Sequence, residues 1–353
     1  MAGYAYLVAA ALCLSGSALA ADDPLDLPAQ ASELAQRRLI TAIAPAGDQA
    51  LVAVGQRGHV LRSGDGGKSW LQAKVPVSSD LTAVQFVDAR VGYATGHDGV
   101  VLRSDDGGAS WTRVLDGRTA NKLLLESMQR LVAAGGGEAQ KKLLEEARRD
   151  VDLGPDKPFL DLWFANANEG FIVGAYNLIF HTADGGKSWQ SWFDRTDNPK
   201  LLSLYAIRSA GKALYIVGES GLLLKLDPGA ERFHALSGDY KGSYFGVLGT
   251  RAGVLAFGMR GNAFLSHDEG QSWQPVASGL AASITAGAAA DDGRVVLVDQ
   301  SGNVATSRDG GVTFSRVVVQ APMPLAAVAV TGTGTLVLGG PRGLRTLDIA
   351  KDK

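Results

Sequence analysis

The chain has 353 residues, of which 46% are apolar and 20% charged, and its formal net charge at pH 7 is −2. A nucleic-acid-binding protein normally carries a basic excess, so this charge argues against nucleic acid as a partner. The apolar content is sufficient for one large core, and the 45 glycines indicate a chain with many turns.

The first 20 residues predict a signal peptide. They contain no charged side chain, are apolar from Leu7 to Leu14, and end in Ala18-Leu19-Ala20. Such a leader predicts an exported, periplasmic protein after cleavage near Ala20. A retained membrane anchor is the alternative, although the apolar stretch is short for a transmembrane helix. The single cysteine, Cys13, lies inside the leader, so the mature chain is expected to have no disulfide.

An eight-residue motif recurs along the rest of the chain. It begins with Ser or Thr, has Asp at its third position and Gly at its fifth, and ends in an aromatic residue. Its clear copies are Ser63 to Trp70, Ser104 to Trp111, Thr182 to Trp189, Ser266 to Trp273 and Ser307 to Phe314. Their aspartates, Asp65, Asp106, Asp184, Asp268 and Asp309, are spaced by 41, 78, 84 and 41 residues.

The long spacings conceal further units. A degenerate copy of the motif at Asp227-Pro228-Gly229 divides the spacing of 84 residues between Asp184 and Asp268. Asp348 fits a truncated seventh copy. The spacing of 78 contains a helix-like insertion. A period of about 40 residues, built from short apolar runs and Asp-Gly turns, is typical of a β-propeller with four strands per blade. We therefore expect an all-β, seven-bladed propeller over residues 38–353.

The second unit shows the expected blade. Four strands are predicted at Leu81 to Phe86, Val91 to Thr95, Val100 to Ser104 and Ser110 to Val114. The turn between the second and third strands is Gly96-His97-Asp98-Gly99. It recurs as Gly-x-x-Gly at 55–58, 218–221 and 258–261. Two glycines at this spacing predict a hairpin turn in which they adopt positive φ.

The insertion, residues 117–157, has a helical period. Leu124, Met128 and Leu131 are spaced for one helix face, and Leu143, Leu144, Ala147 and Val151 follow after Gly135-Gly136-Gly137. This pattern predicts a helical hairpin with an apolar stripe that packs on its own domain. Its charged residues are interpreted as a solvated face.

The seventh unit lacks an outer strand. Since a ring of blades must close, we expect part of residues 21–37 to pair beside the strand at 344–349, which would remove a free edge.

The repeated aspartates are interpreted as structural. A turn aspartate accepts backbone N–H groups, the glycines supply positive φ, and the aromatic residue faces the core of the next strand. This role is assigned to Asp65, Asp106, Asp184, Asp268 and Asp309 and to Trp70, Trp111, Trp189 and Trp273. The alternative is that the carboxylates bind a metal or a substrate, but they are spread around a ring.

These units resemble the Asp-box, or bacterial neuraminidase, repeat. They are most similar to the seven-bladed propellers of the photosystem II assembly and stability factor family. The likeness is fullest from Asp161-Leu162-Trp163-Phe164 to the motif ending at Trp189. It implies an exported binding or assembly factor in a periplasmic or thylakoid-lumen-like compartment, with a membrane protein or envelope complex as its client. It also implies no cofactor.

A catalytic site is not expected. The five histidines form no pair at metal-ligand spacing, so no metal site is predicted. Because Asp-boxes also occur in sialidases, an exported glycan-active hydrolase is the alternative. It would need two carboxylates within about 5–10 Å of each other. Asp161 is the one acidic residue in an inner-strand run, where other units carry Thr41, Thr82, Ser203, Phe245, Thr285 and Ala326. It is predicted to line the central channel, and Glu219 is the only second candidate.

The binding function is assigned to one face of the ring. The Gly-x-x-Gly turns and the connections between blades share this face, and the helical hairpin emerges there and is expected to cover part of it. Polar loops on a rigid scaffold are common binding sites. The predicted partner-binding residues are Arg57, His59, His97, Asp98, Tyr176, Asn177, Glu219, Met259, Arg260 and Arg342. We expect a monomer, compatible with peripheral membrane association.

Overall fold

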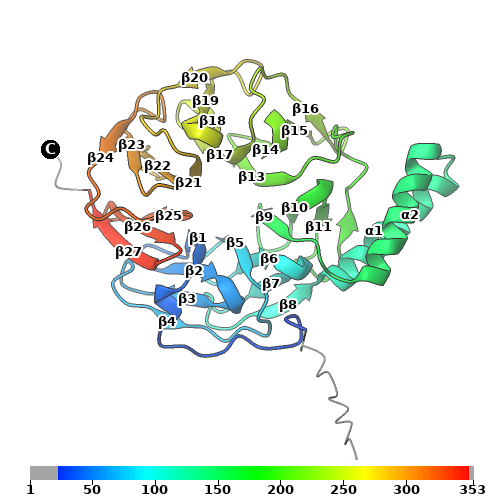
Figure 1. Ribbon diagram of the computed structural model, residues 1–353, viewed down its shortest axis with the longest axis horizontal. Coiled ribbons are helices and arrows are strands. Elements are labelled where there is room, and N and C mark those ends of the chain that lie inside the picture. The colour runs from blue at the N-terminus through cyan, green and yellow to red at the C-terminus, as the bar shows by residue number, and fades with distance from the viewer. Residues whose placement is uncertain (1–22, 350–353) are drawn as a thin grey trace, which may run out of the picture.

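The computed structural model describes residues 23–349, which form a ring of seven antiparallel sheets (Figure 1). The first three sheets contain β1 (Ile40–Pro45), β2 (Leu51–Gly55), β3 (Val60–Ser63) and β4 (Leu71–Gln72); β5 (Leu81–Phe86), β6 (Gly92–Gly96), β7 (Val101–Ser104) and β8 (Thr112–Leu115); and β9 (Phe159–Phe164), β10 (Gly170–Gly174), β11 (Ile179–Thr182) and β12 (Gln190–Ser191). The next three contain β13 (Leu204–Ala210), β14 (Ala213–Gly218), β15 (Leu223–Asp227) and β16 (Arg232–Ala235); β17 (Tyr244–Thr250), β18 (Gly253–Gly258), β19 (Ala263–Ser266) and β20 (Gln274–Val276); and β21 (Ile284–Ala289), β22 (Val295–Asp299), β23 (Val304–Ser307) and β24 (Ser315–Val317). The seventh contains β25 (Ala327–Val330), β26 (Thr335–Gly340) and β27 (Gly343–Asp348). The predicted seven-bladed propeller is confirmed.

The second strand of each blade forms the centre of the core. All five residues of β2, β6, β10 and β22 are buried, because both faces of each sheet are covered by neighbouring blades. Strands buried on both faces read as continuous apolar runs rather than as alternating patterns. The apolar clusters accordingly join adjacent blades, as where Val54 of β2 packs with Leu102 of β7.

Each of six inner strands begins with a bulge that the sequence did not reveal. In β1 the register passes from Ile40 to Ala42, so Thr41 is unpaired and borders the channel. The equivalent residue in the third blade is Leu160, because β9 skips from Phe159 to Asp161. In the fourth blade it is Tyr205, not Ser203. The prediction that Asp161 is equivalent to Thr41 was therefore wrong by one residue. The prediction that Ser203 is equivalent to Thr41 was wrong by two residues.

The bulges also join neighbouring blades. The Thr41 hydroxyl donates to the carbonyl of Leu81 (2.6 Å), and the Thr82 hydroxyl to that of Phe159 (2.8 Å). Thr285 does the same to Leu325 at 2.7 Å. A short polar side chain at this position thus accounts for part of the contact between inner strands.

The N-terminal segment does not pair with the seventh blade. Within residues 23–349, the sheet of β25, β26 and β27 has three strands, so the predicted strand pairing was wrong. The segment follows the outer side of the first blade instead, where Ala29 N–H donates to Val75 (3.1 Å). Leu25 is buried between the first two blades, and only the 3₁₀ turn η1 (Ala35–Arg37) approaches the start of β27. The ring closes by side-chain packing between the first and seventh blades.

Two charged residues explain why the segment takes this path. Asp26 forms ion pairs with Arg118 (2.7 Å) and Arg113 (3.6 Å), and Asp23 pairs with Arg118. The Arg113 guanidinium also donates to the carbonyl of Leu25 at 2.6 Å. The hydrogen bond and ion pair with Arg118 hold the pKa of Asp26 below its usual range. The predicted leader and its cleavage near Ala20 lie outside the described residues.

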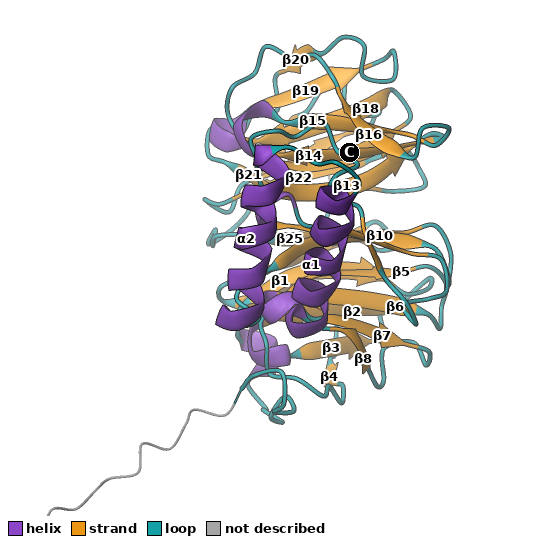
Figure 2. Ribbon diagram, turned by 90° about the vertical axis from the view of Figure 1, so that its right-hand side faces the viewer, coloured by secondary structure: helices purple, strands orange, loops and turns teal. Residues whose placement is uncertain are grey.

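The helical hairpin consists of α1 (Gly117–Ala133) and α2 (Glu138–Leu153), as predicted. Asp116 caps α1 by accepting the Thr119 N–H at 3.0 Å. Within residues 23–349, neither helix has the length and apolarity that crossing a membrane would need. Figures 1 and 2 show the hairpin projecting from the rim of the ring, so the expectation that it covers the binding face was wrong.

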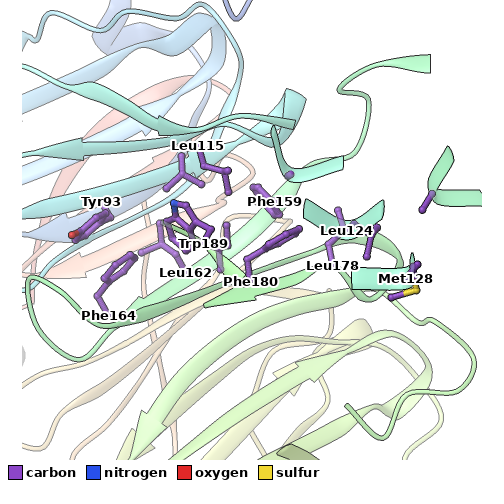
Figure 3. Packing of buried hydrophobic residues seen from close by; sticks show 14 of the residues in the cluster. Tyr93, Leu115, Leu124, Met128, Phe159, Leu162, Phe164, Leu178, Phe180 and Trp189 are labelled. Carbon is purple, nitrogen blue, oxygen red and sulfur yellow. The ribbon is translucent and has the colours of Figure 1, made fainter. Parts of the chain in front are cut away.

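The apolar face of the hairpin packs against the second and third blades. Leu124 and Met128 of α1 are buried in one cluster with Phe159, Leu178 and Phe180 (Figure 3). This burial explains the position at the rim: the apolar stripe covers the outer part of the third blade, next to β12, and leaves the charged faces in solvent.

Candidate functional site

Five turns with the same geometry lie on one face of the ring. They connect the second and third strands as η2 (Gln56–Gly58), η3 (His97–Gly99), η4 (Ala175–Asn177), η5 (Glu219–Gly221) and η6 (Met259–Gly261). In each turn the middle residue has positive φ although it is not glycine: Arg57, Asp98, Tyr176, Ser220 and Arg260. Positive φ at two successive residues is the type I′ geometry that joins twisted strands.

The two glycines of each turn are needed for different reasons. Gly58 has φ of 69°, as predicted, but Gly55 is extended. A Cβ atom on Gly55 would lie 2.0 Å from the Leu39 carbonyl oxygen, which accepts the N–H of Gln56. The first glycine therefore permits close approach of two backbone segments, and the expected positive φ there was wrong.

The face presents most of the predicted partner-binding residues to solvent. Arg57, His97, Tyr176, Arg260 and Arg342 are exposed, and Asp98, Glu219 and Met259 are partly exposed. Arg342 belongs to the equivalent turn between β26 and β27. None of the guanidinium groups of Arg57, Arg260 and Arg342 forms an ion pair with another residue of 23–349, although the Asp80 carboxylate accepts the backbone N–H of Arg57 at 2.7 Å.

Two predicted residues are not on the surface. Asn177 is only 1% exposed and replaces the second glycine, with φ of 64°. Its amide nitrogen donates to Phe193 O (2.9 Å), and its oxygen accepts from Thr196 (3.0 Å) and Asn198 (2.9 Å). It therefore organises the loop after β12. The sequence offered a signal, since asparagine is the residue that most readily replaces glycine at positive φ.

His59 is likewise 5% exposed. Burial lowers the pKa of its imidazole, which favours the neutral ring. The predictions that His59 and Asn177 are displayed to a partner were wrong, because both side chains turn inward below the turn.

The hairpin begins beside this face. A Cβ atom on Gly99 would lie 2.6 Å from the Cα of Gly117, which places the start of α1 against the η3 turn. After α2 the chain returns past the η4 turn, where Lys157 Nζ lies 5.8 Å from the centre of the Tyr176 ring. The hairpin thus extends the turn face outward at the rim.

The central channel contains a cavity of about 210 Å³ bordered by the inner strands. Asp161 lies on its wall, but the carboxylate is turned toward the fourth blade. One oxygen accepts the Ile207 N–H (2.9 Å) and pairs with Arg208 (2.5 Å). Arg208 is the residue that the sequence did not single out. A buried carboxylate that is paired in this way links two blades.

The same geometry argues against the hydrolase alternative. Glu219 accepts the N–H of Ser203, the residue before β13 of the same blade, at 3.2 Å, whereas Asp161 is engaged by Arg208. Each carboxylate has a separate structural partner, and the described residues hold no group of three or more His, Cys, Asp or Glu side chains suited to a metal ion.

The Asp-boxes lie on the opposite face. Asp65 accepts the N–H groups of Lys68 and Ser69 (both 3.0 Å) and the Ser69 hydroxyl at 2.6 Å. Trp70 and Trp111 donate their ring N–H to Gly67 and Gly108, each at 3.1 Å. These contacts are those of a structural turn.

Hydrogen bonds keep the Asp-box carboxylates ionised. Bonds from Ser188 hold the pKa of Asp184 at about 2, and bonds from Ser272 do the same for Asp268. For Asp106, burial acts in the opposite direction, but the bonds from Ser110 and Ser104 outweigh it and the pKa is about 2. The pKa values of Asp65 and Asp309 are lowered for the same reason.

The first residue of each Asp-box has a role that sequence reasoning missed. In the second blade, Ser104 Oγ donates to Asp106 (2.9 Å) and accepts the Gly108 N–H (2.8 Å). The equivalent residues are all buried: Ser63, Ser104, Thr182, Ser266 and Ser307. Their presence in all five copies was the available signal.

The fold and site define a class of protein: a seven-bladed β-propeller with Asp-box turns on one face, strand-connecting turns on the other, and an inserted helical hairpin. A family model described as "Photosynthesis system II assembly factor YCF48" matches residues 26–135 and 140–314. The chain belongs to this family, which confirms the resemblance seen in the repeats.

Two curated relatives carry the name "Photosystem II assembly lipoprotein Ycf48". That of Synechococcus sp. (strain CC9902) is 27% identical over 171 residues, which are 47% of this chain and 51% of the relative. That of Prochlorococcus marinus is 44% identical over 41 residues, 12% of each chain. The chain thus matches about half the length of the first relative and much less of the second.

Solved structures share the fold. "YCF48 bound to D1 peptide" has a TM-score of 0.63 at 16% identity, over 88% of this chain and 93% of that one. "YCF48 from Cyanidioschyzon merolae" has a TM-score of 0.64 at 18% identity, over 88% and 96%. The WD40 propeller domain of Doa1 scores 0.63 at 10% identity, over 93% and 97%. At these identities the likeness shows the propeller architecture alone.

Proposed function

We propose that this protein is an exported, non-enzymatic assembly factor that holds a segment of a membrane-protein client on the face of the Gly-x-x-Gly turns. Its family is described as one of photosystem II assembly factors, and one solved relative is bound to a D1 peptide. The curated relatives are named lipoproteins, which supports export and attachment to a membrane. We further propose that the protein acts as a monomer, without a cofactor.

One observation carries the choice of face. Arg57, Arg260 and Arg342 are exposed at the tips of three turns of the same face, and none of their guanidinium groups forms an ion pair within residues 23–349. The Asp80 carboxylate accepts only the backbone N–H of Arg57, at 2.7 Å. The backbone of Arg57 and Arg260 is fixed in the left-handed region (φ 55° and 57°), so the direction in which each side chain leaves the turn is defined. Guanidinium groups bind carboxylates through two parallel hydrogen bonds. This face therefore suits a client segment that carries acidic residues.

Affinity capture from native envelope, followed by mass spectrometry, tests the proposal. Reversing the three charges together should abolish client capture, because attraction is replaced by repulsion. The matched control reverses three exposed lysines of the Asp-box face, and capture should then be unchanged. The test set is Arg57→Glu, Arg260→Glu and Arg342→Glu, and the control set is Lys68→Glu, Lys187→Glu and Lys212→Glu. Equal loss in both sets would show that only net charge matters, and undiminished capture by the test set would exclude this face.

The hairpin is proposed as a second contact of the client. Exchanging residues 117–157 for a Gly-Ser linker should weaken capture while the ring stays folded, as checked by far-UV circular dichroism. Since this exchange also uncovers Phe180, a second variant is needed that leaves the packing intact. Arg148→Glu with Arg149→Glu changes only exposed residues of α2. Full capture by both variants would remove the hairpin from the proposal.

A further inference from the structure

One residue from each blade borders the mouth of the central channel, and together these residues form a collar at the turn face. Figure 1 shows the inner strands arranged around the channel. In the fifth blade the collar residue is Phe245, which lies in the bulge between Tyr244 and Gly246. Tyr244 pairs with Gly258, the last residue of β18 before η6, and a Cβ atom on Gly258 would lie 3.0 Å from the backbone nitrogen of Phe245. The collar is therefore next to the strand-connecting turns.

The collar has a half with small side chains and a half with large ones. The sixth, seventh, first and second blades, which are consecutive around the ring, contribute Thr285, Ala326, Thr41 and Thr82. The three threonine hydroxyls already donate to carbonyl oxygens of the next blade. The third, fourth and fifth blades contribute Leu160, Tyr205 and Phe245, whose side chains are all partly exposed. An apolar wall thus stands across the mouth from small residues.

The cavity below the collar has room for one aromatic side chain. Its volume is about 210 Å³, whereas an apolar cavity of about 150 Å³ holds benzene. The rings of Tyr205 and Phe245 are inclined at 63° with their centres 5.7 Å apart. A third ring that entered from the mouth would find the same edge-to-face contact that these two rings make with each other.

The floor of the cavity is polar. Arg208 borders it, and its side chain is 40% exposed. Its Nη1 atom donates to Asp161 (2.5 Å) and to the carbonyl oxygens of Leu162 (3.2 Å) and Ile207 (2.6 Å). Its Nε and Nη2 atoms make no hydrogen bond within residues 23–349. Because Asp161 and Leu162 directly follow the collar residue Leu160, this guanidinium lies about 3–7 Å below the collar, at about 3.3 Å per residue. A tyrosine side chain, with an apolar ring and a hydroxyl that accepts hydrogen bonds, matches such a cavity.

Positive charge surrounds the mouth on one side. Arg260 lies in η6, beside the collar residue of the fifth blade, and Arg57 and Arg342 lie on the equivalent turns of the first and seventh blades. Two carboxylates, those of Asp98 and Glu219, lie on the turns of the second and fourth blades. Acidic residues next to an aromatic residue of a bound segment would therefore face the arginines of the fifth, seventh and first blades.

We propose that the channel mouth is the specificity pocket of the turn face and takes one tyrosine side chain of the client segment. The ring packs on Leu160, Tyr205 and Phe245, and the hydroxyl accepts a hydrogen bond from Arg208. Acidic residues on either side of the tyrosine bind the arginines of the turns. This inference rests on the proposed function, because it names the residue by which the client held on that face is recognised. A single aromatic residue that fills a pocket commonly supplies a large share of the binding energy.

Matched synthetic peptides test the proposal by fluorescence anisotropy on the purified full chain. The labelled probe has a central tyrosine, a pair of glutamates on each side and a serine at each end. Exchanging its tyrosine for alanine should weaken binding at least about tenfold, and exchanging it for phenylalanine should weaken binding about two- to tenfold. Exchanging all glutamates for glutamines tests the arginine contacts of the proposed function separately.

Variants of the protein assign the pocket. Ala326→Phe fills the mouth from its small half without removing a side-chain hydrogen bond, and it should weaken binding of the tyrosine peptide at least about tenfold. Phe245→Ala removes part of the wall and should reduce the ratio of the tyrosine and alanine affinities at least about threefold. The control is Ala230→Phe, at an exposed residue of the turn between β15 and β16 on the opposite face, and it should leave both affinities unchanged. Melting temperatures check that each variant is folded.

The outcomes separate this proposal from the proposed function. Binding that weakens on glutamate exchange but not on tyrosine exchange would overturn the pocket and leave the proposed function standing. Binding that depends on the tyrosine alone would support the pocket and contradict the arginine contacts. The pocket is also refuted if the tyrosine peptide shows no saturable binding up to about 1 mM, or if exchanging its tyrosine for alanine has the same effect in Phe245→Ala as in the unsubstituted protein.

Discussion

Replacing Ser104 with alanine should destabilise the protein more than replacing Asp106, although Asp106 is the residue that marks the motif. Ser104 is 1% exposed, and its hydroxyl both donates to Asp106 and accepts the buried N–H of Gly108. Asp106 is exposed and binds Ser110 through its N–H (2.9 Å) and hydroxyl (2.6 Å). The hydroxyl of Ser104 is therefore the buried centre of the turn.

The expected magnitudes follow from this difference in burial. Ser104→Ala leaves the Gly108 N–H without a partner inside the protein, which costs about 1–3 kcal/mol, and it also removes a bond to a charged group. A total loss of about 2–4 kcal/mol in the free energy of unfolding is expected. Asp106→Ala removes several bonds, but water can replace them at the surface, so a loss of about 1–2 kcal/mol is expected.

Urea unfolding followed by tryptophan fluorescence measures both variants and the double variant. The two residues should be coupled by at least about 0.5 kcal/mol, since they share a hydrogen bond. Asp105→Ala is the control, because Asp105 is exposed and only pairs with Arg103 (2.8 Å), and it should cost less than about 1 kcal/mol. The reasoning is refuted if Asp106→Ala is the more damaging change, or if Ser104 and Asp106 act additively.

Three further predictions concern the acid range, the turns and the N-terminal segment. The pKa of Asp184 is lowered to about 2, so its contribution to the free energy of unfolding is complete above about pH 4 and is lost as the pH falls to about 2. Urea unfolding of Asp184→Asn across this range should show a free energy of unfolding that depends less on pH than that of the unsubstituted protein. An equal pH dependence in the two proteins would contradict this. Gly96→Ala should lower the melting temperature, because its Cβ would lie 2.2 Å from a backbone carbonyl oxygen. Gly64→Ala should leave the melting temperature unchanged, because its Cβ would meet nothing within 4 Å. Equal melting temperatures of the two variants would contradict this prediction. Leu25→Ala should lower the free energy of unfolding, measured in urea, by about 2–5 kcal/mol, because the side chain is buried. The control Leu27→Ala, at a residue 38% exposed, should lower it by less than about 1 kcal/mol. If Leu25→Ala leaves the stability unchanged, the N-terminal segment is not docked.

The repeat could be recognised in the sequence because the residues that form each turn are close together in the chain. An Asp-box places Ser104, Asp106, Gly108 and Ser110 within seven positions, and the hydrogen bonds among them join residues two to four apart. Turn chemistry at this range depends on backbone conformation and short side chains. The number of blades followed from the spacing of these turns, and the helical hairpin followed from the apolar period of residues 117–157.

The binding face was predictable only in part. That the turns share one face followed from strand order, and the exposure of Arg57 and Arg260 agrees with it. The burial of Asn177 did not follow, because its partners Phe193, Thr196 and Asn198 belong to a loop 16 to 21 residues away. The orientation of Asp161 depended on Arg208, which lies 47 residues further on and in the next blade.

Ring closure was decided by the tertiary structure alone. The sequence by itself determined seven units and an incomplete last blade, and both are observed in the described residues. It did not determine where the N-terminal segment lies, because an extended polar segment can pair with any free edge. The choice was made by contacts between distant residues: Leu25 and Arg113 are 88 positions apart, and Asp26 and Arg118 are 92. Burial of Leu25 and these charge pairs hold the segment on the first two blades, and it adds no strand to the sheet of β25, β26 and β27.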